Sequence, residues 1–120
     1  MAKILVVDDQ KDIVDSITSI LENQGFSVEK AYDGKECLER INENDKESVK
    51  LVFLDIMMPG INGYEVAKQL KGMFHDNIKI VYVSIKPKAE VHMGEADGFI
   101  QKPFGIGDII DTAKKFALAR

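Results

Sequence analysis

Polar side chains stand at the ends of four apolar runs in this sequence. Asp8 and Asp9 follow the first run, Asp55 follows the run in "LVFLDI", and Ser84 and Lys102 close two later runs. A carboxylate at the edge of an apolar core costs on the order of several kcal/mol unless a partner compensates it. Each residue is therefore either a satisfied structural group or part of a site for chemistry.

Three acids, a hydroxyl and an ammonium in one place would favour phosphoryl chemistry. Two carboxylates about 4 Å apart repel by about 4 kcal/mol at an effective dielectric of about 20, so three would raise a pKa or hold a cation. Ligation by oxygen alone suits a hard ion such as Mg²⁺, and Lys102 neutralises only part of the charge. Mg²⁺ beside a lysine and a hydroxyl can receive a phosphoryl group, with Asp55 as the candidate nucleophile.

The elements that must position these residues alternate along the chain. Strand-like runs are expected at 3–8, 26–31, 50–55, 78–83 and 98–101, and helical spacing predicts helices near 13–21, 37–41, 64–74 and 106–117. This alternation predicts a parallel sheet with helices on both faces. Because parallel strands end at one edge, the polar residues at those ends should converge there.

Each of these residues also has a structural interpretation. Asp8 or Asp9 could cap the helix that follows. Ser84 could be a turn residue, Lys102 a solvated charge, and Asp55 an acceptor at the start of a loop. The conjunction favours a shared site, because four of the five expected strands deliver a chemically useful group to one edge.

Composition narrows the class of protein. A chain of 120 residues with 45% apolar and 30% charged residues is typical of one globular domain that needs no disulfide or structural metal to fold. The net charge of −4 argues against non-specific binding to nucleic acid. Without a bilayer-length apolar run or a signal-peptide pattern, we expect no membrane association and a cytoplasmic location. Cys37, the only cysteine, is expected in the core, with a reactive thiol as the alternative.

Four motifs in this order resemble the receiver domain of two-component response regulators. They are "ILVVDDQ" at 4–10, "VFLDIMMPGINGYE" at 52–65, Ser84, and "FIQKPF" at 99–104, and the resemblance covers about 3–118. It implies an α/β, flavodoxin-like, doubly wound five-stranded parallel sheet of order 2-1-3-4-5 with about five helices. We therefore expect 1–120 to be a single receiver domain without an output domain, similar to a stand-alone chemotaxis regulator.

The resemblance also implies how the acids act. Asp55 would take a phosphoryl group from a phosphohistidine on a sensor histidine kinase or a phosphotransfer protein. Asp9, Asp55 and the backbone carbonyl of Met57 would ligate Mg²⁺, while Asp8 would act through a bound water. The protein would be a signalling switch and no enzyme, beyond assisting its own phosphorylation and dephosphorylation.

The switch itself is implied by three further residues. Lys102 would pair with a phosphoryl oxygen, the Ser84 hydroxyl would move to bond another, and Phe99 would follow as the switch aromatic. The family also implies a cis bond at Lys102–Pro103. A monomer would then bind a downstream protein target differently in its two states.

The sequence departs from the family pattern in two places. Ile85 stands where the family usually has a small residue, and is expected to narrow access to the phosphoryl group. Only 18 positions separate Ser84 from Lys102, so a fourth helix at 89–96 should be short or irregular. Met57 and Lys86 occupy positions that tune the phosphoryl lifetime in the family.

Other classes fit less well. A haloacid-type phosphatase needs a second acid two positions after the nucleophile, where Met57 stands, and a flavodoxin-type carrier needs a phosphate loop where the acidic "DDQKD" stands. The serious rival is a receiver-like interaction module that is not phosphorylated, which Ile85 and the short fourth helix favour. His75 and His92 lie away from strand ends and are interpreted as surface residues.

Overall fold

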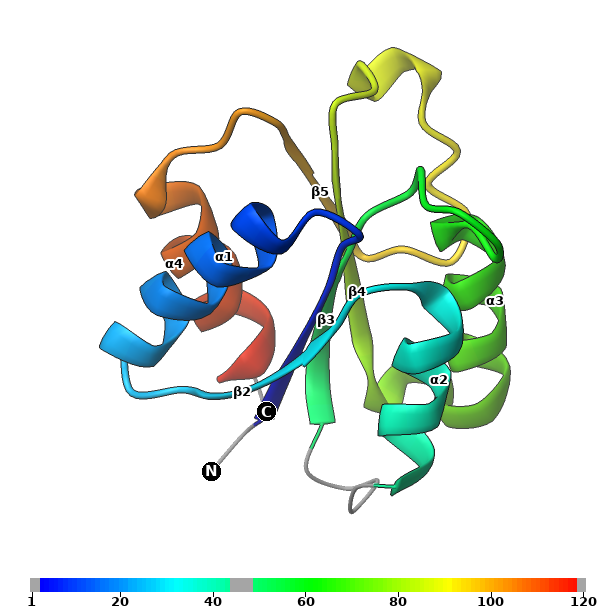
Figure 1. Ribbon diagram of the computed structural model, residues 1–120, viewed down its shortest axis with the longest axis horizontal. Helices are drawn as coiled ribbons and strands as arrows, with labels where there is room; N and C mark the ends of the chain where they lie inside the picture. Colours follow the sequence, from blue (N-terminus) through cyan, green and yellow to red (C-terminus); the bar gives the residue numbers. More distant parts are fainter. Residues whose placement is uncertain (1–2, 44–48, 119–120) are drawn as a thin grey trace.

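The computed structural model describes residues 3–43 and 49–118, which form one sheet between two layers of helices (Figure 1). The strands are β1 (Lys3–Val7), β2 (Ser27–Ala31), β3 (Val49–Leu54), β4 (Lys79–Ser84) and β5 (Gly98–Gln101). The α-helices are α1 (Lys11–Asn23), α2 (Gly34–Glu43), α3 (Gly63–Phe74) and α4 (Ile106–Ala117). The described residues also contain two short 3₁₀ helices, η1 (His75–Asn77) and η2 (Lys88–Glu90).

The sheet is parallel throughout and has the order β2-β1-β3-β4-β5, which confirms the order that the family resemblance implies. β1, β3 and β4 form its centre, and their continuous apolar runs are explained by burial on both faces. Val7 pairs with Leu54, and Leu54 pairs with Tyr82, so the three central strands end close to one level. All the loops that follow the strands therefore open on the same edge.

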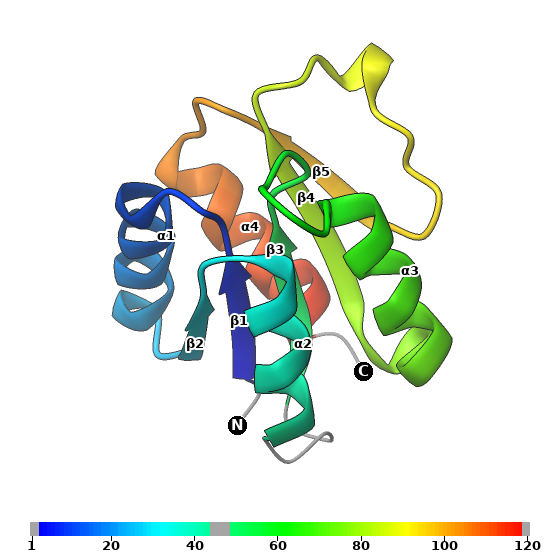
Figure 2. The same ribbon diagram turned by 45° about the vertical axis from the view of Figure 1, so that its right-hand side comes forward.

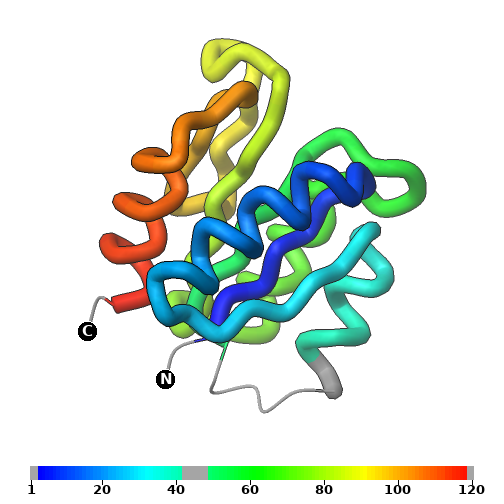
Figure 3. The backbone as a smooth tube through the Cα atoms, turned by 60° about the vertical axis from the view of Figure 1, so that its left-hand side comes forward, coloured from blue at the N-terminus to red at the C-terminus, as the bar shows by residue number. Residues whose placement is uncertain are grey.

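Each face of the sheet carries its own core. Alternation along β1 sends Ile4 and Val6 to one core and Leu5 and Val7 to the other. α1 and α4 cover the first face, where they lie side by side (Figure 3), and α2 and α3 cover the second (Figure 2). Full burial of each such aliphatic side chain contributes about 1.5–3 kcal/mol, so the strands are held firmly from both sides.

Cys37 lies in α2 and faces the core beneath α2 and α3, where its side chain is buried. Burial raises the pKa of the thiol to about 12, and the nearby Asp33 carboxylate contributes in the same direction. The interpretation of Cys37 as a core residue is confirmed. In the described residues, no helix combines the length and the apolar character that crossing a bilayer would need.

The number of helices differs from the prediction. About five were expected, whereas residues 3–43 and 49–118 contain four α-helices, because the segment 85–97 forms only the 3₁₀ turn Lys88–Glu90. Pro87 lies directly before that turn, and Gly94 has a positive φ of 43°. A proline at the entry and a left-handed glycine near the exit leave too little chain for an α-helix. The segment forms the arch beside α3 (Figure 2).

Asp97 fixes the end of this arch to the sheet. Its backbone N–H donates to the carbonyl of Ile80 at 2.7 Å, and its carboxylate accepts from the N–H of Ile80 at 2.9 Å. Nζ of Lys71 lies 2.8 Å from the same carboxylate and 2.8 Å from the carbonyl oxygen of Ile78. The Lys71 side chain is only 10% exposed, so this ion pair joins α3, β4 and the start of β5 within the protein.

Candidate functional site

The backbone fixes the acids at the carboxyl edge of the sheet. Asp55 follows β3 directly, and its N–H donates to the carbonyl of Val7 at 2.9 Å. Asp8 follows β1, and its N–H donates to the carbonyl of Ala31 at 3.2 Å. Both residues thus continue the parallel ladders by one hydrogen bond, which sets the direction of their side chains.

The three acids come together at this edge, as the strand-end argument predicts. Carboxylate oxygens of Asp8, Asp9 and Asp55 all lie within 4.8 Å of one another. Asp8 and Asp55 are 2% and 6% exposed, whereas Asp9 is exposed. A cluster of hard oxygen ligands that is open on one side suits a cation that keeps part of its water.

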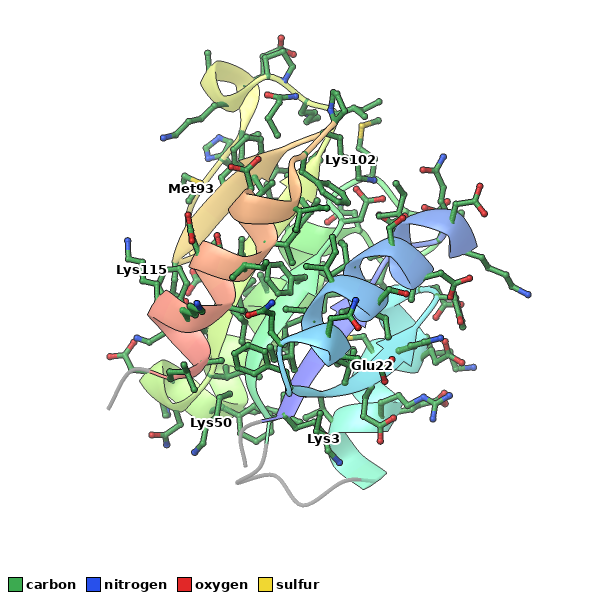
Figure 4. The ribbon with its side chains drawn as sticks, turned by 90° about the vertical axis from the view of Figure 1, so that its left-hand side faces the viewer. Lys3, Glu22, Lys50, Met93, Lys102 and Lys115 are labelled. Carbon is green, nitrogen blue, oxygen red and sulfur yellow. The ribbon has the colours of Figure 1, made fainter. Side chains whose placement is uncertain are left out.

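Lys102 reaches the same cluster from the end of β5. Its Nζ lies 2.8 Å from Oδ2 of Asp8 and 3.8 Å from Oδ2 of Asp55, and its side chain is 10% exposed. The Lys102–Pro103 bond is cis, as the resemblance implies. Figure 4 shows Lys102 at the upper end of the sheet, where the loops gather. One ammonium therefore compensates two buried carboxylates.

Asp8 does not cap α1. The N-cap residue is Gln10, whose side chain makes no capping bond, and Oδ1 of Asp8 accepts from the N–H of Gln10 at 2.9 Å. This bond orders the turn before the helix. Since Oδ2 of Asp8 is paired with Lys102, both oxygens of Asp8 have partners within the protein.

Asp55 is the acid whose ionisation is most disturbed. Burial is the largest cause and the Asp8 carboxylate the second, and together they raise the pKa of Asp55 to about 7. Lys102 and a backbone hydrogen bond from Met57 lower the pKa in part, and Asp9 adds a smaller increase. A carboxylate so disfavoured gains strongly from added positive charge.

The loop after Asp55 is built on two glycines. Gly60 has a φ of 77°, a conformation that other residues rarely adopt. The N–H of Gly63 donates to the carbonyl of Ile56 at 2.8 Å, and a Cβ at Gly63 would collide with the backbone carbonyl of Asp55. α3 therefore begins directly against the loop that carries the nucleophile candidate.

Ser84 and Phe99 lie on the adjacent strands. Ser84 is fully buried, and its Oγ accepts from the N–H of Lys86 at 3.2 Å. Phe99 pairs in register with Tyr82, and its partly buried ring packs against the core under α2 and α3. Both residues thus lie in the two strands that border Lys102.

The remaining candidates lie at the surface. Met57 and Ile85 are 56% and 69% exposed, so the expected narrowing of the site by Ile85 remains a prediction. His75 and His92 are exposed as interpreted, and the His92 ring stands edge-on to Tyr64 at 6.4 Å.

Sequence reasoning did not single out Gln101. Its side-chain amide reaches the backbone of the loop after β4, and its position directly before Lys102 was the only available signal. Side-chain contacts to backbone carbonyls leave no pattern in a sequence.

The fold and the site define a flavodoxin-like α/β domain with a cluster of acidic residues at its carboxyl edge. Residues 4–114 match the model of the response regulator receiver domain. The chain therefore belongs to the response regulator receiver domain family of two-component systems, and the resemblance seen in the motifs is confirmed.

Curated relatives include transcriptional and other regulators of similar sequence. The chain is 34% identical over 119 residues to the transcriptional regulatory protein CpxR homolog of Haemophilus influenzae, covering 95% of this chain and 49% of that protein. It is 32% identical over 115 residues to the regulatory protein VanRc of Enterococcus gallinarum, covering 93% and 48%. The chain thus spans about half the length of the curated relatives it matches.

Solved structures show the same fold. The response regulator TrrA of Thermotoga maritima, crystallised in complex with Mg²⁺–BeF, is 30% identical with a TM-score of 0.85, covering 96% of this chain and 98% of that one. A CheY-like receiver domain protein of Methanospirillum hungatei is 27% identical with a TM-score of 0.82, covering 96% and 92%.

Proposed function

We propose that this chain is a phospho-accepting switch in which Asp55 receives a phosphoryl group from a phosphohistidine. The observation that carries the proposal is the nearly buried Asp55 carboxylate within one cluster with Asp8 and Asp9 and 3.8 Å from Lys102. The core has no need of such a cluster, because burying Asp8 and Asp55 beside a third acid disfavours folding. The repulsion among the carboxylates would instead favour binding of a cation, and the bound cation would favour an incoming phosphoryl group.

The transfer uses the chain's own groups in simple roles. A carboxylate oxygen of Asp55 forms the new P–O bond as the P–N bond of the donor breaks, and the electron pair of that bond remains on the imidazole nitrogen. The fixed backbone at Asp55 holds the oxygen in place. Lys102 lies within reach to neutralise a phosphoryl oxygen.

The donor set fits Mg²⁺. Asp9 and Asp55 would bind the ion directly with the Met57 carbonyl, and Asp8 would act through water. The partners of Asp8 support this division, because both of its oxygens are already engaged while Asp9 is exposed. When bound, Mg²⁺ supplies positive charge that offsets the carboxylates and the incoming phosphoryl oxygens.

The response to phosphorylation would run through Ser84, Lys102 and Phe99. An acyl phosphate adds charge and acceptor oxygens, so the ammonium and the hydroxyl gain contacts that the resting state lacks. Burial of Ser84 beside the site and the partial burial of Phe99 support a coupled rearrangement. The changed surface would alter binding to a downstream protein.

The partners are a sensor histidine kinase or phosphotransfer protein and a protein target. Because the curated relatives are about twice as long, the output of the whole protein is part of this proposal. The alternative is a receiver-like interaction module without phosphorylation. The exposed Ile85 and the arch in place of a fourth helix are the observations that favour it.

Intact mass after incubation with acetyl phosphate and Mg²⁺ tests the proposal, with Asp55→Asn as the matched variant. We expect one phosphoryl adduct in the parent that requires Mg²⁺ and is absent from the variant. Binding of beryllofluoride with Mg²⁺ provides a second readout for an adduct that hydrolyses quickly. No adduct and no beryllofluoride binding would overturn the proposal and favour the alternative.

A further inference from the structure

The side chain of Gln101 bridges the ends of β4 and β5. Its amide nitrogen lies 2.9 Å from the carbonyl oxygen of Ile85 and 3.4 Å from those of Ser84 and Lys102. A glutamine amide has two N–H donors and can serve two of these carbonyls at once. Since Ser84 and Gln101 are the last paired residues of the two strands, the amide extends their pairing by one further rung.

One peptide unit connects this amide to the Ser84 hydroxyl. The carbonyl of Ile85 accepts from Gln101, and the N–H of the same unit, that of Lys86, donates to Oγ of Ser84 at 3.2 Å. The unit is planar, so fixing the direction of the carbonyl also fixes the direction of the N–H. Accepting a hydrogen bond polarises the unit and strengthens its donation.

We infer that Gln101 is a positioning residue that holds the Ser84 hydroxyl in its resting place, an inference that rests on the proposed phosphoryl switch. In the proposed switch, the Ser84 hydroxyl moves to a phosphoryl oxygen, and this movement takes its oxygen away from the N–H of Lys86. Loss of the Gln101 amide weakens that competing contact and moves the switch toward the phosphoryl-bound state.

The position of Gln101 suits a coupling role. Phe99 and Gln101 project from the same side of β5, because side chains alternate along a strand, and Ile100 between them packs into the opposite core. The amide therefore connects the loop that carries Ser84 to the strand that carries the aromatic residue.

Beryllofluoride binding at saturating Mg²⁺, followed by calorimetry, tests the inference. Gln101→Met keeps the length of the side chain and removes its donors, and Gln69→Met is the same change on the exposed side of α3. We expect about three- to tenfold tighter binding in Gln101→Met and parental affinity in Gln69→Met. In a Ser84→Ala background, Gln101→Met should have no effect.

A second measurement needs no phosphoryl analogue. In the resting protein, we expect the amide proton of Lys86 to shift upfield and to exchange faster in Gln101→Met than in Gln69→Met, as followed by ¹⁵N NMR. This readout reports the N–H that Gln101 is inferred to direct.

The outcomes separate the two proposals. A parent that fails to bind beryllofluoride overturns the switch, and the Lys86 amide then decides alone whether Gln101 directs the peptide unit. A parent that binds, with unchanged or weaker binding in Gln101→Met, overturns the role of Gln101. The same conclusion follows if the tighter binding persists in the Ser84→Ala background.

Discussion

At the scale of single residues, the site is a balance between one ammonium and three carboxylates. Asp8 and Asp55 are nearly buried and share Lys102, while Asp9 stays in solvent. Removing the ammonium leaves the carboxylates uncompensated and should lower stability, whereas removing one of the carboxylates reduces their mutual repulsion and should raise it.

Asp55→Asn should stabilise the metal-free protein at high pH. The pKa of Asp55 is raised to about 7, so its contribution to stability is fully present below the unfolded value near 4 and is lost as pH rises through about 7. In EDTA, we expect the variant to exceed the parent by about 1–3 kcal/mol at pH 8 and by much less at pH 5. Urea unfolding at both pH values measures this difference, and an equal gap at the two would contradict it.

Lys102→Met should destabilise the metal-free protein by about 3 kcal/mol at neutral pH, because it leaves two buried carboxylates without their cation. The double variant Lys102→Met with Asp8→Asn removes one of those charges and should recover part of the loss. Urea unfolding in EDTA compares the three proteins. Equal stability of the single and double variants would refute this account of the site.

At the scale of elements, an ion pair and a glycine fix how the loops and helices meet the sheet. The arch at 85–97 lacks an α-helix, and its end is held by Asp97. The start of α3 packs so closely on the loop after β3 that only glycine fits at position 63. The Asp97 contacts hold the arch against β4, and the Gly63 contact holds the start of α3 against the loop after β3.

Asp97→Ala should cost about 2–4 kcal/mol, because it removes the nearest carboxylate from the nearly buried Lys71 and the acceptor of the Ile80 N–H. Asp76→Ala is the matched control, since that carboxylate lies 4.0 Å from Lys71 and its side chain is 95% exposed. The control should change stability by less than about 0.5 kcal/mol. Trypsin cleavage after Lys88 should accelerate only in Asp97→Ala; similar cleavage in both would argue against the anchor.

Gly63→Ala and Gly72→Ala place the same methyl group at two positions in α3. At Gly63 the added Cβ collides with the Asp55 backbone, whereas at Gly72 nothing lies within 4 Å. We expect Gly63→Ala to lose about 2 kcal/mol or more and Gly72→Ala to gain about 0.5–1 kcal/mol. Thermal unfolding of the two variants measures both changes in stability. If both variants were stabilised, the close contact between position 63 and the Asp55 backbone would be disproved.

At the scale of the molecule, most of the architecture could be predicted from apolar runs. The runs ending at Asp8, Asp55 and Ser84 located strand ends to within one residue, and parallel pairing then brought the acids together. The ion pair between Lys102 and Asp8 joins residues 94 positions apart, and no local pattern encodes such a partner. The missing helix follows from proline and glycine near its ends, whereas the anchor at Asp97 depends on tertiary contacts alone.

Mg²⁺ should stabilise the whole domain, because an ion that binds only the folded protein raises its free energy of unfolding. At a free concentration of about 100 times Kd, the expected gain is about 2.7 kcal/mol, lost again on adding EDTA. Asp9→Asn removes a proposed ligand from the exposed side of the site. The rise in its free energy of unfolding on adding Mg²⁺ should therefore largely disappear. Unfolding by urea with and without the ion measures both proteins, and a full gain in Asp9→Asn would rule out that ligand.

The strand order also sets a sequence of events during synthesis. After β2, every new strand joins the same growing side of the sheet, first β3 on β1, then β4, then β5. Lys102 lies at the end of β5 and is the last of the site's residues to be synthesised. A sheet that formed before β5 was added would carry Asp8, Asp9 and Asp55 without that lysine, and a bound cation would be the remaining counter-charge.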